Sequence, residues 1–299
     1  MKSPDDVAIS WLTSFLAVVD NGTFTAAAVA THRSQPRVSA HVAALERMIG
    51  TRLLERDTRQ ASLTEAGERL LPHARAAVSE VRAGIDSVGT LAGELQGTVR
   101  VGSFAGPSGI LLAPLIKRFR EVHPQVTVDL REGGPRWLED AAATFAVDLA
   151  LRTADVPTHH DLRSAHLLNE RIVLAVPSGF PVPDLSERLP LENQPLVVTG
   201  APTEGWSDFT DRLSAEAITP ETMTTVAHPT TVISLVRAGL GIGLLGEMGA
   251  AVSALGDIDL HPMPEPIWTR DIRVYWNARR QLNTASQIFL DALLEAMTG

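Results

Sequence analysis

Gly22 to Glu46 reads GTFTAAAVATHRSQPRVSAHVAALE and contains two short helical patterns joined by a tight connection. The first pattern, Thr25 to Ala30, is rich in alanine, whose small side chain lets a second helix approach closely. The second begins at Ser34-Gln35-Pro36, because serine favours the N-cap and proline is tolerated in the first helical turn. Its apolar residues recur at helical spacing and form one face: Val38, Val42 and Leu45.

The other face of the second helix carries polar or small side chains: Gln35, Arg37, Ser39, Ala40 and His41. A short helix that packs on an alanine-rich partner and turns a polar face outward is suited to enter a DNA major groove. On these residues alone, a helix pair in some other α-helical protein remains the alternative.

The residues around the two helices continue in a recognisable order. They comprise Gly22 to Ala28, Ser34-Gln35-Pro36, Ser39, Leu45-Glu46, Gly50 to Arg56 (GTRLLER) and Leu63 to Gly67 (LTEAG). This order, over about forty-five nearly continuous positions, resembles the winged helix-turn-helix of LysR-type transcriptional regulators. The resemblance implies sequence-specific binding of double-stranded promoter DNA by a homodimer or homotetramer that responds to a small-molecule effector.

Composition and charge limit the other classes. The 299 residues suit two or more domains, and the absence of cysteine excludes disulfides, thiol catalysis and cysteine-ligated metals. The net charge of −9 argues against DNA binding only until it is divided along the chain. Between Gly22 and Leu63 there are six basic and three acidic residues, so a locally basic module stands on an acidic chain.

No segment predicts export or a membrane span. Only Ile9 to Val19 is apolar enough for a signal-peptide core, but polar residues interrupt it and Asp5 and Asp6 precede it. Its apolar residues fall at helical spacing and predict a buried first helix. No run is long and apolar enough to cross a bilayer, so we expect a cytoplasmic protein without a membrane partner.

A wing and a long helix are expected next. Short β segments around a polar, basic tip would form the wing, in which Arg56 and Arg59 lie against the sugar-phosphate backbone or in the minor groove; a solvated surface hairpin is the alternative. The helix begins at Thr64, and Pro72 should bend it. Its apolar positions alternate by three and four residues: Leu70, Ala74, Ala77, Val81, Ile85, Val88, Leu91 and Leu95. This seam predicts a symmetric dimer, with packing against the chain's own C-terminal domain as the alternative.

Beyond a hinge at residues 94–98, short β-branched strands alternate with helices and predict an α/β domain. The expected first elements are a strand at 98–102, a helix at 110–122, a strand at 126–130, a helix at 137–145 and a strand at 147–151. This order resembles the first half of the family's effector domain, a relative of periplasmic binding proteins.

We therefore expect an α/β chain with an all-α-type winged helix-turn-helix N-terminal domain and a two-lobed, periplasmic-binding-protein-like C-terminal effector domain. The expected boundaries are 1–63 for the DNA-binding domain, 64–97 for the linker (dimerisation) helix and hinge, and 98–299 for the effector domain. Lobe I would span about 98–168 and 269–299, and lobe II about 169–268.

Effector-binding candidates lie where predicted strands end, because ligands of open α/β sheets bind beyond the carboxyl ends of strands. The junction Gly102 to Gly109 follows one strand and opens a helix, so its backbone N–H groups and Ser103 could hold an anionic or polar ligand. Arg152 could pair with a carboxylate through two hydrogen bonds. The full candidate set is Ser103, Phe104, Ala105, Arg131, Arg152, Thr199, Thr203, His228 and Thr230.

Three other patterns carry no chemistry. Gly241 to Gly246 (GIGLLG) matches a dinucleotide fingerprint in its letters, but a helix precedes it and a strand follows, the reverse of what pyrophosphate binding requires. His159-His160 and His166 lack confirming metal-ligand spacing, so a solvated loop is favoured. No nucleophile elbow is present. We expect no cofactor, no metal and no catalytic residue.

The expected DNA contacts fall into two groups. Base-edge candidates are Gln35, Arg37 and His41, and expected phosphate contacts are Arg33, Ser34, Ser39, Arg56 and Arg59, with Thr25 a further DNA-binding candidate. The chain departs from the family pattern at Thr31, Arg33 and Ala40; an arginine is common at the last of these, and Arg37 can replace it.

Two other readings compete with a regulator. A solute-binding protein predicts export and ligand binding without DNA, and an enzyme predicts turnover. The missing signal peptide opposes the first, and the missing catalytic constellation opposes the second. The effector, the operator sequence, the target genes and the sign of regulation do not follow from the residues.

Overall fold

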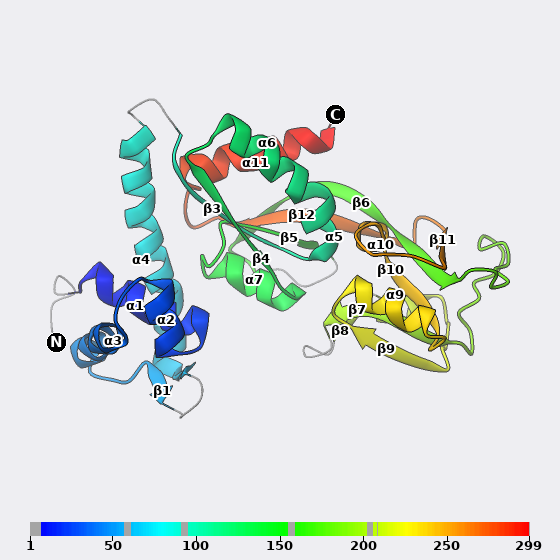
Figure 1. The fold of residues 1–299 in the computed structure, drawn as a ribbon, viewed down its shortest axis with the longest axis horizontal. Helices are drawn as coiled ribbons and strands as arrows, with labels where there is room; N and C mark the ends of the chain where they lie inside the picture. Colours follow the sequence, from blue (N-terminus) through cyan, green and yellow to red (C-terminus); the bar gives the residue numbers. More distant parts are fainter. Residues whose placement is uncertain are drawn as a thin grey trace. The chain divides into compact units, whose positions relative to one another are not determined.

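The computed structural model describes residues 7–56, 61–90, 95–154, 159–201, 206–207 and 209–298. The chain divides into two compact units, one formed by residues 1–93 with 143–146 and the other by the rest of the chain. Figure 1 gives the order of the elements along the chain.

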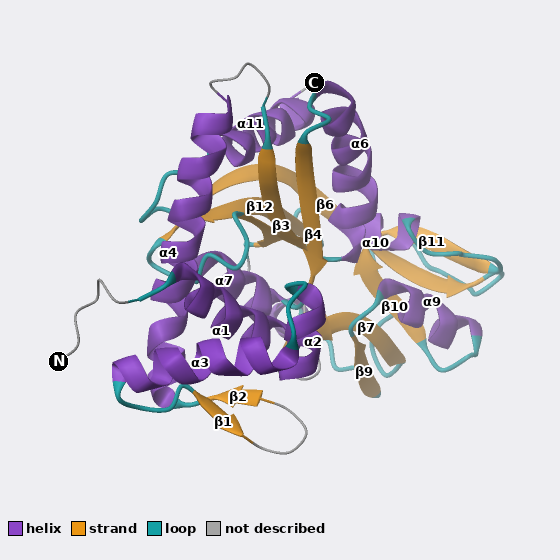
Figure 2. Cartoon of the chain, turned by 60° about the vertical axis from the view of Figure 1, so that its left-hand side comes forward, coloured by secondary structure: helices purple, strands orange, loops and turns teal. Residues whose placement is uncertain are grey.

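The first unit is a three-helix cluster followed by a hairpin and a long helix (Figure 2). Its helices are α1 (Ile9–Asn21), α2 (Phe24–Ala30) and α3 (Gln35–Ile49). Left-handed glycines end α1 and α3, with φ of 72° at Gly22 and 88° at Gly50. Thr23 begins α2, where its hydroxyl accepts a hydrogen bond from the backbone N–H of Ala26 at 3.0 Å.

One apolar core joins these helices. Its fully buried members come from all three helices and from the segments that follow: Phe15, Val18, Ala27, Val38, Val42, Leu45, Leu53, Leu54 and Ala74. The structure thus confirms the apolar face that was predicted for the helix after Ser34, which is α3, and it confirms the buried first helix, α1.

Strands β1 (Leu54–Arg56) and β2 (Ala61–Leu63) form the antiparallel wing. The carboxylate of Glu46 near the end of α3 accepts the backbone N–H groups of Leu53 and Leu54 at 2.9 and 3.3 Å, which ties the wing to α3. The wing tip, with the predicted DNA contact at Arg59, lies outside the described residues.

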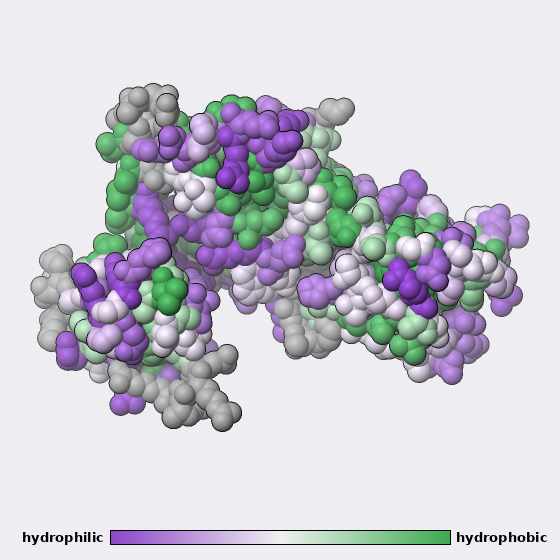
Figure 3. Space-filling view, in the orientation of Figure 1, coloured by the Kyte–Doolittle hydropathy of each residue, from purple (hydrophilic) through white to green (hydrophobic). Residues whose placement is uncertain are grey.

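Helix α4 (Glu65–Thr90) continues through Pro72. The first part of its predicted seam does not face outward: Leu70, Ala74 and Ala77 pack in the core of the first unit. Farther along, Val81, Ile85 and Val88 are 42%, 65% and 67% exposed. Hydrophobic surface follows this part of α4 in the space-filling view (Figure 3). The expectation that the whole seam lacks a partner within the chain was therefore wrong for its first turns.

The second unit is a mixed sheet covered by helices. Its strands are β3 (Gly97–Ser103), β4 (Val126–Glu132), β5 (Leu149–Thr153), β6 (Leu162–Pro177), β7 (Pro195–Ala201), β8 (Trp206–Ser207), β9 (Thr222–Val226), β10 (Ile242–Gly246), β11 (Ile258–Pro262) and β12 (Thr269–Asn277). Its helices are α5 (Ala105–Pro107), a π-helical turn η2 (Ser108–Leu112), α6 (Ala113–Val122), α7 (Pro135–Ala143), α8 (Thr210–Ala215), α9 (Pro229–Arg237), α10 (Glu247–Ala251) and α11 (Thr284–Thr298).

The strand order is β4-β3-β5-β12-β6-β10-β7-β8, with β11 also on β6 and β9 also on β7. Two long antiparallel strands carry the chain between the lobes, and Figure 1 shows them running together across the domain. Residues 162–171 of β6 pair with β12, whereas residues 172–177 pair with β10 and β11. The two-lobed α/β architecture is confirmed.

The helical segment that follows β3 begins earlier than the sequence predicted. Helical structure begins at Ala105 and runs through the π-helical turn into α6, so the helix does not begin at Ile110. Gly106 and Gly109 let the α10 region pack closely against this helical segment, because a Cβ at either would press on Met248, Gly249 or Val252.

Among the described residues, no single helix is long and apolar enough to cross a bilayer. Helices α1 and α2 reach that length only together, and they meet at 115°.

Two glycines of α4 give opposite expectations for replacement by alanine. A Cβ at Gly67 would overlap the carbonyl oxygen of Leu53, whereas a Cβ at exposed Gly84 meets nothing within 4 Å. Gly67→Ala should therefore destabilise the first unit by about 1–3 kcal/mol, and Gly84→Ala should stabilise it by up to about 1 kcal/mol. Hydrogen exchange of the α3 amides measures both changes. Equal effects of the two replacements would contradict the packing described here.

Candidate nucleic-acid interface and effector cleft

The first turns of α3 present the polar groups that could read DNA. Ser34, Gln35 and Arg37 are exposed at this end of the helix, while Val38 behind them is completely buried. The side-chain amide of Gln35 donates to Ser39 Oγ at 3.2 Å, which orients the amide along the helix. Thr25, in the first turn of α2, is also exposed. Amide and guanidinium donors on one exposed helix face match the acceptors of purine edges.

Two other predicted DNA contacts, Arg33 and His41, share one partner on α1. Arg33 Nη1 donates to Ser14 Oγ at 3.0 Å, and Ser14 Oγ lies 2.8 Å from His41 Nδ1. Ser14 itself is completely buried, and both partners are half-buried. Sequence reasoning missed Ser14 because its hydroxyl lies on an apolar helix and matched no motif.

This environment lowers the pKa of His41 below its ordinary value. Partial burial is the largest cause, and the positive charges of Arg33 and Arg37 add to it, against a smaller opposing effect of the Ser10 carbonyl. His41 is therefore uncharged near neutral pH.

The wing supplies the remaining candidates. Arg56 ends β1, paired with Ala61 of β2, so its backbone position at the base of the wing tip is defined. That α3 and the wing together contact DNA stays a prediction from the sequence.

The second unit contains a cavity of about 80 Å³ between its two lobes. Its lining comes from the ends of strands and the beginnings of helices on both lobes, and includes Phe104, Arg152, Thr153, Thr199, Gly246 and Arg270. Among the described lining residues, the charged side chains are arginines, Arg152 and Arg270. Because Arg270 is ion-paired with the buried Glu170, Arg152 is the main source of positive charge among these residues. Phe104, Pro135 and Leu138 add apolar surface.

Arg152 is the deeper of the two, only 1% exposed. Its guanidinium lies 4.2 Å from the centre of the Tyr275 ring, and Nη1 is 3.4 Å from the carbonyl oxygen of Thr153. Burial lowers the pKa of Arg152, against opposing contributions from Tyr275 and Glu139. An anion in the cavity would relieve this desolvation cost.

Arg270 belongs to a buried ion pair at the crossing between lobes. Arg270 Nε donates to Glu170 Oε2 at 2.5 Å, and Glu170 Oε1 accepts the backbone N–H of Met248 in α10 at 2.9 Å. The guanidinium also lies 5.3 Å from the centre of the Phe104 ring. A Cβ at Gly246 would overlap both ionic groups, which explains a glycine there. Arg270 was missed because antiparallel pairing of β6 with β12 cannot be read from spacing.

The structure brings together some of the predicted effector residues. Phe104, Ala105, Arg152 and Thr199 line the cavity. The other described candidates are not among its lining residues: Ser103, Arg131, His228 and Thr230. Ser103 is completely buried at the end of β3, and Thr203 lies outside the described residues. Arg131 instead pairs with Asp129 at 2.9 Å.

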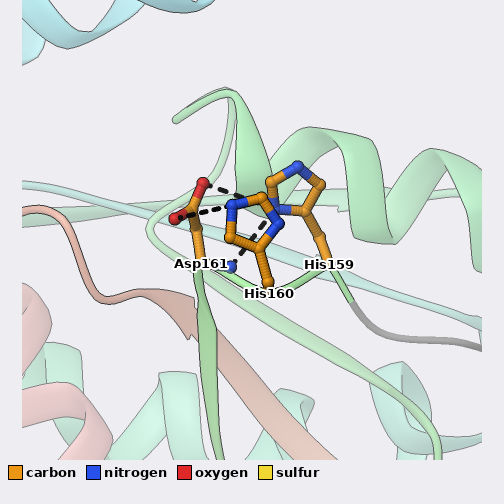
Figure 4. Close-up of side chains that lie close together, drawn as sticks. All are labelled: His159, His160 and Asp161. Carbon is orange, nitrogen blue, oxygen red and sulfur yellow. Dashed lines mark hydrogen bonds and ion pairs between the residues drawn. The ribbon is translucent and has the colours of Figure 1, made fainter.

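The histidine pair gathers around an aspartate, as Figure 4 shows. Asp161 lies 3.5 Å from His159 Nδ1 and 3.4 Å from His160 Nε2. Its carboxylate also accepts from Arg279 Nε at 2.9 Å, and this positive charge opposes a metal cation at the same place. His166 pairs separately with Asp271. We assign no metal site to this cluster.

In the glycine-rich segment Gly241 to Gly246, residues Ile242–Gly246 form the buried strand β10, which follows helix α9. This is the order that the sequence predicted. Gly241 has a φ of +145°, and a Cβ there would overlap the carbonyl oxygen of Pro195. The glycines therefore serve close packing and not a phosphate loop.

The lowered pKa of His41 has a consequence for stability. In the unfolded chain a histidine takes up its proton near pH 6.5, whereas the folded chain resists protonation until lower pH. His41 should thus contribute stability above that pH and lose the contribution as the pH falls from about 6.5 through the folded pKa. An NMR titration, with the His41 signal assigned by its absence in His41→Gln, should give a midpoint below 6.5. A midpoint at or above this value would contradict the electrostatics described here.

Known families match both units. A family model described as the LysR substrate binding domain matches residues 92–298. A second, described as the bacterial regulatory helix-turn-helix protein of the lysR family, matches residues 9–68.

Individual proteins agree with these matches. The uncharacterized HTH-type transcriptional regulator YvbU of Bacillus subtilis (strain 168) is 26% identical over 97% of this chain and 98% of its own. The HTH-type transcriptional regulator CfxR of Cupriavidus necator is 29% identical over 94% of this chain and 89% of its own.

The crystal structure of CbnR, a LysR family transcriptional regulator, has a TM-score of 0.68 at 24% identity and covers 97% of this chain and 99% of CbnR. CbnR is also solved as a full-length complex with its target DNA, with a TM-score of 0.65 at 23% identity over 97% of this chain and 99% of that one. The chain therefore belongs to the LysR family and is a LysR-type transcriptional regulator with a helix-turn-helix DNA-binding domain and an effector-binding domain.

Proposed function

We propose that α3 reads an inverted-repeat operator from the major groove, with Gln35 and Arg37 as its main base contacts. The observation that carries this proposal is the exposure of both side chains on a helix whose opposite face is buried against α1 and α2. Glutamine suits adenine and arginine suits guanine. Ser34, Ser39 and the wing arginines Arg56 and Arg59 would contact the sugar-phosphate backbone. The solved CbnR complex with its target DNA supports this mode of binding.

We also propose that the chain acts as a dimer or a dimer of dimers. The exposed apolar side chains of α4 at Val81, Ile85 and Val88 support this, because water is an unfavourable surrounding for such a stripe. A two-fold pair of α3 helices would match an inverted repeat. In this scheme residues 1–63 bind DNA, 64–97 link and dimerise, and 98–299 bind the effector.

The effector would be a small carboxylate bound between the lobes. Arg152 gives the cavity its positive charge, since Arg270 is already ion-paired with Glu170, and the bidentate geometry of a guanidinium suits a carboxylate. Phe104, Pro135 and Leu138 would contact an apolar body of modest size. Because both lobes line the cavity, the ligand would favour one arrangement of the lobes over another.

Membership of a regulator family supports the further proposals that the chain is not an enzyme and acts in the cytoplasm, where the DNA is. The competing solute-binding reading predicts ligand binding without any DNA complex.

Replacing Arg37 tests the reading of DNA. Arg37→Ala should cost about 1–3 kcal/mol of operator binding and relax the preference at one base position. Arg47→Ala removes the same charge from the last turn of the same helix and should leave base preference unchanged. Mobility shifts on the DNA upstream of the chain's own gene, and on single-base variants of the bound site, measure both. A loss that is uniform over all sequences would make Arg37 a phosphate contact.

Replacing Arg152 tests the effector cavity. In a thermal-shift screen, carboxylates should stabilise the wild-type chain more than the matching amides do. Arg152→Gln should lose about 2–5 kcal/mol of binding free energy for such a carboxylate, Arg152→Lys should lose less, and Arg131→Gln, outside the cavity, should lose none. Equal stabilisation by carboxylates and amides would contradict an anionic effector.

A further inference from the structure

The buried hydroxyl of Ser14 joins α1 to the base-reading helix α3. Its oxygen is within hydrogen-bond distance of one atom of Arg33 and one atom of His41, at 3.0 and 2.8 Å. Ser14 is completely buried, whereas its neighbour Thr13 turns its hydroxyl to the Ile9 carbonyl of the same helix at 2.9 Å. Ser14, unlike Thr13, therefore directs its hydroxyl away from its own helix to Arg33 and His41.

Hydrogen-bond chemistry limits which group donates. A guanidinium has only donors, so Arg33 Nη1 must donate to the Ser14 oxygen. This oxygen keeps a second lone pair, so His41 Nδ1 can either accept the hydroxyl hydrogen of Ser14 or donate its own proton to the oxygen. The positive charge of Arg33 beside the ring favours the first arrangement, in which Nδ1 carries no proton. A neutral imidazole with Nδ1 as acceptor carries its proton on Nε2.

The surroundings of His41 favour the neutral ring. Arg33 and Arg37 are the cations near it, and the Ser10 carbonyl is the one group that favours protonation. Arg33 also reaches this carbonyl, at 3.5 Å, so the same guanidinium approaches both oxygens of α1. Through Nη1, Arg33 thus holds two oxygens of α1.

We propose that Ser14 is a positioning residue for DNA recognition: it holds His41 as the Nε2–H tautomer, so that His41 offers a hydrogen-bond donor to the major groove. An Nε2–H donor suits the acceptors guanine O6 or N7, adenine N7 and thymine O4, and it opposes the amino groups of cytosine and adenine. Ser14 would thus influence base preference without touching DNA. The proposal rests on α3 being the base-reading helix of the proposed function.

The tautomer is measured without DNA. Two-bond ¹H–¹⁵N correlation spectra of the full chain with labelled histidine should show His41 as the Nε2–H form, assigned by its absence in His41→Gln. Ser14→Ala should shift His41 towards a mixture of tautomers, and Thr13→Ala should leave it unchanged. An unchanged tautomer in Ser14→Ala would overturn the lock.

A double-mutant cycle on operator DNA tests the role in recognition. Ser14→Ala should weaken binding to the preferred site about 5- to 10-fold and reduce the preference at one base position, and Thr13→Ala should do neither. In a His41→Gln background Ser14→Ala should have no further effect, because the glutamine amide has no tautomer to hold. If Ser14→Ala costs the same in both backgrounds, Ser14 only supports the packing of α1, and the proposal fails.

Failure of the proposed function would give a different experimental result from failure of the role proposed for Ser14. If the wild-type chain binds no DNA fragment, DNA reading by α3 fails, and the role of Ser14 in base preference fails with it. The NMR spectra would still decide whether Ser14 sets the tautomer of His41.

Discussion

The packing of α1 against α3 is the constraint on which DNA recognition depends. Phe15, Val38 and Val42 are almost completely buried where these helices meet, so α3 has one fixed face and one free face. The small side chains of Ala27 and Ala28 let α2 lie close beside them. Because the apolar contact fixes the rotation of α3 about its own axis, it also determines that Gln35 and Arg37 point to solvent. Glu46 extends the same rigid body to the wing by holding Leu53 and Leu54.

The fold of the first unit could be predicted well from sequence because its determinants are local. Periodicity gave the buried face of α3, and serine, proline and glycine gave its ends. The polar network was not predictable, since Ser14 meets Arg33 and His41 across a helix interface that no spacing reveals. The same limit applies to α4, whose apolar pattern is continuous in sequence although its first turns are buried and Val81, Ile85 and Val88 are exposed.

The effector domain illustrates the opposite case, in which non-local strand pairing builds the site. Arg152 was found from sequence because it ends a buried strand, but Arg270 reaches the cavity only through the pairing of β12 with β6. Its partner Glu170 also accepts the backbone N–H of Met248 in the first turn of α10. One buried carboxylate therefore joins β12 to α10 beside the cavity. Ser103, the strongest effector candidate in the sequence, is not among the residues that line the cavity, and its side chain is completely buried at the end of β3.

We propose that paired copies of α3 read the base sequence of the operator. Selection of bound fragments from a pool of random duplex DNA, at physiological salt and with the full chain, tests it most directly. The structure predicts enrichment of an inverted repeat whose half-sites are centred one or more whole helical turns apart, about 10 base pairs or multiples of this distance. Binding that enriches no sequence, and that depends only on salt and fragment length, would contradict the account.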